Sequence, residues 1–89
     1  MATLKVHIPS ALRGYTGRLG EVSASGTTVG GLLRDLERRF PGLRWRVVDE
    51  QGRLRPHIRV SVNEAVVPSL EVRLKEGDRV ALIMAFSGG

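Results

Sequence analysis

Residues 27–40 of this 89-residue chain read TTVGGLLRDLERRF and decide the fold, because their pattern predicts one amphipathic helix. The apolar side chains recur at the spacing of a helical turn and form a single stripe, as in a helix that covers a core. This stripe consists of Val29, Leu32, Leu33, Leu36 and Phe40. Thr27 or Thr28 can cap the first turn, and Pro41-Gly42 ends the helix. The charged side chains between the stripe positions are expected to face water; they are Arg34, Asp35, Glu37, Arg38 and Arg39.

Alternating segments lie on both sides of this helix. Residues 3–8 (TLKVHI) and 21–25 (EVSAS) alternate between apolar and polar types, which predicts two half-buried strands joined through a turn at 13–17. After the helix, residues 43–48 are expected to form a short helical turn, and residues 57–62 alternate again. A short strand is expected around Val66, with Pro68 marking a sheet edge. The run 79–86 is apolar at both alternating sets of positions, which favours a central strand covered on both faces.

The order of these elements is strand, strand, helix, strand, short strand, strand. It predicts the α+β class, in which one main helix packs across a mixed sheet as a roll. A chain of 89 residues is long enough for one modest core, so we expect a single domain.

The residue inventory excludes several kinds of chemistry. The chain contains no Cys, which excludes disulfides, thiolate metal ligands and a cysteine nucleophile. His7 and His57 are the only histidines, and neither has a second ligand at metal-binding spacing, so no metal site is expected. Gly30-Gly31 lacks the Lys of a phosphate-binding loop, so we expect the chain itself to bind no nucleotide or other cofactor.

The net charge of +5 comes mainly from arginine and favours an acidic partner. Arginines between residues 34 and 55 could also form a nucleic-acid surface, but Trp45, Tyr15 and two Phe give few stacking positions. Nucleic acid is therefore a less favoured partner than an acidic protein. No apolar stretch approaches the roughly 20 residues of a membrane span, and no leader pattern is present at the start. We expect no membrane partner and a cytoplasmic location.

The element order, the segment KEGDRV at 75–80 before the last strand, and Ser87-Gly88-Gly89 together resemble the MoaD/ThiS family of ubiquitin-like sulfur carriers. The resemblance covers essentially the whole chain. Residues 8–13 (IPSALR), 15–17 (YTG) and 49–63 (DEQGRLRPHIRVSVN) are most similar to the CysO-like branch, which serves a bacterial cysteine-synthesis route. The resemblance implies a ubiquitin-like β-grasp domain over 1–86 and a flexible tail over 87–89. The chain departs from the family at MAFSGG (84–89), where the family often has PAVAGG.

What the resemblance implies for function is a carrier rather than an enzyme. An E1-like enzyme would adenylate the carboxylate of Gly89 with ATP, and sulfur would convert the product to a thiocarboxylate. A sulfur-accepting synthase would then take the sulfur, with the cysteine route favoured and the molybdopterin and thiamin routes left open. Gly88, Ser87 and Phe86 would lie in the partner's active site, since glycines without side chains fit a narrow channel. The bulky Phe86 is expected to influence which activating enzyme accepts the tail.

The family also implies a docking face on the exposed side of the sheet beside the tail. By pattern, this face would carry His57, Arg59 and Ser61, although the same positions are polar in any half-exposed sheet. Two alternatives stay open: a ubiquitin-like protein modifier conjugated through Gly89, and a basic nucleic-acid-binding module. Taken alone, the two glycines are also typical of a frayed terminus, but they follow directly from the most apolar strand.

Overall fold

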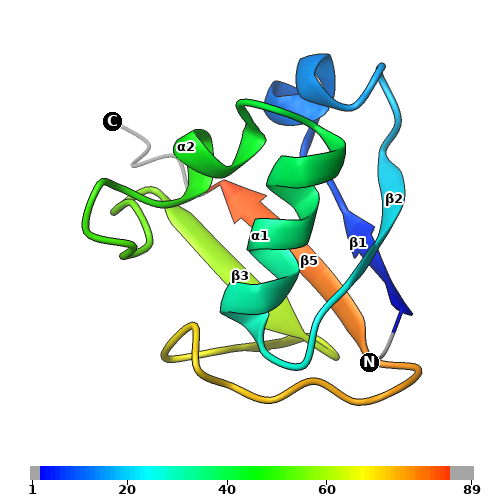
Figure 1. Cartoon of the computed structure of the whole chain (residues 1–89), viewed down its shortest axis with the longest axis vertical. Helices are drawn as coiled ribbons and strands as arrows, with labels where there is room; N and C mark the ends of the chain where they lie inside the picture. Colours follow the sequence, from blue (N-terminus) through cyan, green and yellow to red (C-terminus); the bar gives the residue numbers. More distant parts are fainter. Residues whose placement is uncertain (1–2, 85–89) are drawn as a thin grey trace.

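The computed structural model describes residues 3–84, and Figure 1 shows helices packed across one face of a sheet. The elements, in chain order, are β1 (Thr3–His7), the 3-10 helix η1 (Ser10–Tyr15), β2 (Glu21–Ser25), α1 (Val29–Arg39), α2 (Leu43–Val47), β3 (Ile58–Val62), β4 (Ala65–Val66) and β5 (Arg79–Met84). The predicted order of strands and main helix is confirmed. The expected boundary between a domain at 1–86 and a tail at 87–89 lies outside the described residues.

The sheet has five strands in the order β2-β1-β5-β3-β4. β1 and β5 are parallel, whereas the β1–β2, β3–β5 and β3–β4 pairs are antiparallel. The sheet is therefore mixed, as predicted. β5 lies in its centre, and Pro68 follows β4, which forms one edge.

Helix α1 forms for the reasons that the sequence indicated. Thr28 is the N-cap, and its Oγ1 accepts a hydrogen bond from the Gly31 N–H at 3.1 Å. The stripe residues from Val29 to Leu36 are buried, while Phe40 is half-buried at the C-cap. Arg38 and Arg39 occupy the last turn, where positive charge complements the helix dipole.

The core lies between α1 and one face of the sheet (Figure 1). Apolar side chains from alternate positions of the strands meet the helix stripe there. The strand residues of this layer are Leu4, Val6, Val22, Ala24, Ile58, Val60, Val80 and Leu82. The segment around α2 closes the core with Leu43, Val47 and Val48, all buried as expected for the predicted helical turn.

Three local predictions are wrong. Residues 10–15 form a 3-10 helix in which Leu12 is buried and its N–H donates to the Pro9 carbonyl at 2.9 Å, so the turn expected at 13–17 begins only at residue 16. β5 is central, but among residues 3–84 the helices cover only one of its faces, and Ile83 keeps 39% of its surface exposed.

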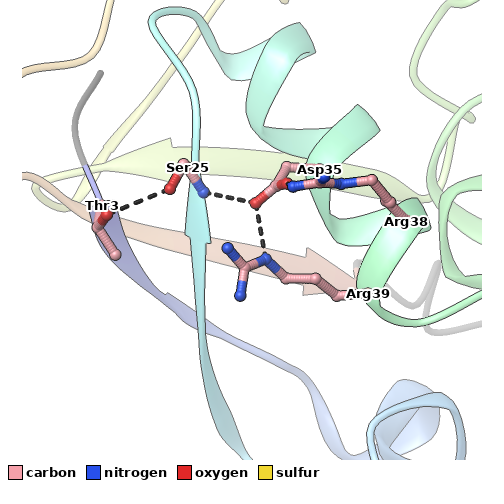
Figure 2. Close-up of polar contacts among 5 residues, drawn as sticks. All are labelled: Thr3, Ser25, Asp35, Arg38 and Arg39. Atoms are coloured by element: carbon pink, nitrogen blue, oxygen red, sulfur yellow. Dashed lines mark hydrogen bonds and ion pairs between the residues drawn. The ribbon is translucent and has the colours of Figure 1, made fainter.

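The third wrong prediction concerns two charged side chains of α1 that were expected to face water. The Asp35 side chain is only 10% exposed, and its carboxylate binds the backbone of Ser25 and the guanidinium groups of Arg38 and Arg39 (Figure 2). Glu37 is half-buried, and its carboxylate accepts the N–H groups of Gly42 and Arg44. These carboxylates fasten α1 to neighbouring backbone instead of meeting solvent.

Candidate functional site

The residues predicted to carry the chemistry, Gly89, Gly88, Ser87 and Phe86, lie outside the described residues. The structure does describe β5, the strand that leads toward them. Val80 and Leu82 of β5 are buried, and the strand is held between β1 and β3. The chain is therefore fixed as far as Met84, which pairs with Ile58 of β3.

The start of β5 is fixed by a polar clamp that sequence reasoning missed. The Asn63 side chain accepts the Arg79 N–H at 2.9 Å and donates to the Asp78 carboxylate at 2.9 Å. Asp78 also accepts the Lys75 N–H at 2.8 Å, and these two hydrogen bonds lower the pKa of its carboxyl group. Asn63 and Glu64 both have positive φ, so they form the tight turn between β3 and β4. In the sequence, the Asn63-Glu64 pair was the signal that could have indicated this turn and its clamp.

The sheet face opposite the helices is open, and it carries the predicted docking residues in part. Arg59 is exposed on β3 and is the register partner of Ile83 on β5. His57 is exposed too, but it lies in the turn before β3 and not on the strand. The structure therefore brings Arg59 together with an exposed apolar residue, Ile83, that the pattern had assigned to a covered face.

Ser61 is a correction, because it is only 6% exposed. Its register partners are Ala81 on β5 and Val66 on β4, so strands flank it on both sides. The short serine side chain does not extend past these neighbouring strands into solvent. Ser61 belongs to the floor of the open face and does not present a docking side chain.

A groove of about 770 Å³ runs over this floor. Small residues form its base at Ala81 and Ser61, and His7 and Glu21 line it beyond β5. Lys5 pairs with Glu21 at 3.7 Å, but both side chains are exposed, so this ion pair adds little stability. The charged residues that line the groove are of both signs.

Two further observations bear on the kinds of site that the described residues can form. Between residues 3 and 84, no three His, Asp or Glu side chains gather in a way that could hold a metal ion. None of the helices in the same range has the length and apolar character that crossing a membrane demands.

Comparison with known proteins places this geometry in a family. The ThiS family profile matches residues 6–89, which include the two glycines. The chain belongs to the ThiS family. Sulfur carrier protein CysO of Mycobacterium tuberculosis (strain ATCC 25618 / H37Rv) is 36% identical over 89 residues, an alignment that covers 94% of this chain and 96% of the relative.

Solved structures agree with this membership. A chain in the crystal structure of the Amycolatopsis orientalis BexX/CysO complex superposes with a TM-score of 0.90 at 37% identity, covering 97% of this chain and 99% of that chain. SAMP1 from Haloferax volcanii gives a TM-score of 0.84 at 28% identity, covering 99% and 100%. These are ubiquitin-like β-grasp proteins, so the predicted fold and the resemblance to the CysO-like branch of the ThiS family are confirmed.

Proposed function

We propose that this ThiS family member is a sulfur carrier that acts as a substrate of partner enzymes and holds sulfur as a thiocarboxylate on Gly89. The observation that carries the proposal is the 36% identity to sulfur carrier protein CysO across 94% of the chain. The family match extends through Gly88-Gly89, which supports assigning the acyl chemistry to that pair.

The chemistry needs activation, because a carboxylate has a poor leaving group. In the proposed first step, a carboxylate oxygen of Gly89 attacks the α-phosphorus of ATP on an E1-like enzyme, and pyrophosphate leaves. Hydrosulfide sulfur then attacks the acyl carbon, and AMP leaves. The resulting thiocarboxylate is a sulfur nucleophile, so the carrier needs no cysteine of its own. ATP belongs to the activating partner.

The described structure supports this proposal through the way β5 is held. Five β5 residues are in register with β3, and Val80 and Leu82 anchor the strand in the core. A segment that continues from Met84 therefore starts from a rigid body. Residues 86–89 would span about 13 Å if extended at roughly 3.3 Å per residue, which is enough to enter an active site while the sheet stays docked outside.

Arg59 on β3 and Ile83 on β5 are the residues that we assign to docking on the open face, and His57 comes directly before β3. An arginine beside an exposed aliphatic side chain is a common feature of protein interfaces, where both residue types contribute to buried contacts. The acceptor that we favour is the synthase of a cysteine-synthesis route, on the strength of the CysO-like relatives. The molybdopterin and thiamin routes stay open as acceptors.

A second candidate function is a protein modifier conjugated through Gly89. The observations that favour it are the structural likeness to SAMP1, a small archaeal modifier protein, and the 37% identity to small archaeal modifier protein 3 of Haloferax volcanii over 70% of this chain. The match to CysO covers 94% of the chain at 36% identity, whereas the match to small archaeal modifier protein 3 covers 70% at 37% identity, so the carrier function stands first.

The decisive experiment is the intact mass of the protein after incubation with ATP, sulfide and an E1-like enzyme of proven competence. A gain of about 16 Da, the difference between sulfur and oxygen, is expected for a thiocarboxylate. The matched control is a variant without Gly89, which should keep the fold and gain no mass. An unchanged wild-type mass, or isopeptide adducts on lysines, would reject the carrier in favour of the alternatives.

A further inference from the structure

An exposed indole on α2 stands out on the side of the molecule next to the end of β5. Trp45 is the single tryptophan of the chain, and half of its surface is exposed. The guanidinium carbon of Arg44 lies 5.9 Å from the centroid of its ring, within cation–π range. Exposing a large aromatic side chain to water is unfavourable. An exposed indole beside an arginine is therefore well suited to contact another molecule.

Three arginines on α2, on the segment after it and on β3 are held in place by neutral acceptors. Arg46 Nε donates to the Tyr15 hydroxyl at 2.7 Å, and Arg55 Nε donates to the Trp45 carbonyl at 2.7 Å. Arg59 Nη1 donates to the Pro56 carbonyl at 2.8 Å. We call Trp45, Arg46, Arg55 and Arg59 the arginine–tryptophan patch. Each guanidinium group has five N–H donors, so most donors stay available to a partner.

The arginines of this patch are not committed to ion pairs within the described part of the chain. None of its arginines forms an ion pair there, whereas Arg38 and Arg39 both pair with Asp35. The nearby carboxylates keep their negative charge and are oriented by backbone N–H groups. Asp49 accepts the N–H groups of Gln51 and Arg53, and Glu37 accepts those of Gly42 and Arg44. The patch is therefore an exposed ring followed along the chain by positioned guanidinium groups, none of which is in an ion pair within residues 3–84.

Its position connects it to the working end of the chain. Arg55 joins α2 to β3, because its N–H donates to the Val47 carbonyl and its carbonyl accepts the Ile58 N–H. Ile58 in turn is the register partner of Met84, the last described residue of β5. Figure 1 shows α2 beside the arrowhead of β5. A protein that received residues beyond Met84 in its active site would meet the patch with the surface around that site.

We propose that the arginine–tryptophan patch docks the acidic rim of the enzyme that loads Gly89, with Trp45 as the buried anchor and the arginines as charge-pairing groups. This inference rests on the proposed sulfur-carrier function. Trp and Arg dominate the energetics of protein interfaces, and preorganised charges mainly set partner choice and association rate. A single indole suits a protein pocket better than single-stranded nucleic acid, which stacks successive bases on several rings.

The test measures loading kinetics with the E1-like enzyme that adds about 16 Da to the wild-type protein. Trp45→Ala and the double variant Arg55→Glu/Arg59→Glu should each raise the KM for the carrier about tenfold and leave kcat within about twofold, because they weaken docking and not the chemistry. Lys75→Glu/Arg73→Glu is the matched control, since both side chains are exposed in the segment before β5, far from its Met84 end. Raising the salt concentration from about 0.05 M to about 0.3 M should raise the wild-type KM and have less effect on the double variant.

The outcomes separate the two proposals. A wild-type protein that gains no mass overturns the carrier function and the patch with it. A protein that is loaded with the same KM in every variant overturns the patch alone. Trp45 is exposed, so Trp45→Ala is expected to fold, and circular dichroism checks this for each variant. Tight binding of a labelled single-stranded oligonucleotide that Trp45→Ala abolishes, with loading unchanged, would overturn the protein-docking assignment in favour of nucleic acid.

Discussion

The Asp35 carboxylate accepts a hydrogen bond from the backbone N–H of Ser25 at 2.8 Å, which joins helix α1 to the edge strand β2 (Figure 2). Arg38 and Arg39 bind the same carboxylate at 2.7 and 2.8 Å. The Ser25 hydroxyl lies 3.2 Å from the Thr3 hydroxyl of β1, so the cluster reaches from the helix to the second strand. Asp35 thereby occupies a backbone donor at a sheet edge that would otherwise be open to another chain.

This cluster predicts a pH dependence of stability. The Ser25 N–H, followed by Arg38, lowers the pKa of Asp35 from 3.8 to about 2. Since the folded-state pKa lies below the unfolded value, the stabilisation is present above about pH 4 and is lost as pH falls toward 2. The arginine partners extend into solvent, so we expect Asp35→Asn to cost only about 1 kcal/mol at pH 7. Urea unfolding from pH 2 to pH 7 measures the difference, which should shrink below pH 4. Parallel curves for the two proteins would contradict the assignment.

A second prediction concerns the close approach of β2 to α1 at Gly26. A Cβ atom at this position would lie 2.5 Å from the Leu32 nitrogen and 2.8 Å from its Cα. Backbone atoms cannot move aside as a flexible side chain does, so Gly26→Ala should destabilise the fold by about 2–4 kcal/mol. Gly14→Ala is the matched control, because nothing lies within 4 Å of a Cβ there. Equal midpoints of chemical unfolding for the two variants would show that the helix and strand are not held this closely.

The elements that could be predicted from the sequence are those with a local signal. The stripe from Val29 to Leu36 and the alternation in residues 3–8 and 57–62 depend only on the period of a helix or a strand, so they identified α1, β1 and β3 correctly. Asp35 could not be placed in this way. Its partner, Ser25, lies ten positions earlier and meets it only after the strand and helix pack together.

The candidate site could likewise be predicted only where the sequence carries a local signal. The family was identified from motifs and Arg59 was placed on the open face by alternation, whereas the role of the two glycines stays a prediction. Ser61 and Ile83 were misassigned because their exposure depends on which strands flank them and on how many layers cover the sheet, and neither property has a period in the sequence. Trp45 was given no docking role, because the exposure of a single aromatic residue leaves no repeating pattern in the sequence.

The N-cap of α1 gives a third prediction. Thr28 Oγ1 accepts the Gly31 N–H, which would otherwise lack a partner in the first turn. Thr28→Ala should lower the free energy of unfolding by about 1 kcal/mol. Thr27→Ala changes the neighbouring exposed side chain, keeps the backbone carbonyl that accepts the Leu74 N–H, and should change stability by less than about 0.5 kcal/mol. A larger loss in Thr27→Ala than in Thr28→Ala would be inconsistent with this cap.

The last prediction separates the two faces of β5 by comparing neighbouring residues. Leu82 is 1% exposed in the core, so Leu82→Ala should cost about 2–4 kcal/mol of stability through a cavity. Ile83 is 39% exposed on the open face, so Ile83→Ala should cost less than about 1 kcal/mol.

The effects on loading by the E1-like enzyme should run in the opposite order. At a temperature where both variants stay folded, Leu82→Ala should leave the KM for the carrier unchanged, because its side chain faces α1 and meets no partner. Ile83→Ala should raise that KM severalfold, since it removes apolar area next to Arg59 that docking would bury. Stability is read from chemical unfolding and KM from initial rates of the mass change. If Ile83→Ala is loaded with the wild-type KM, the open face beside the end of β5 does not dock the loading enzyme.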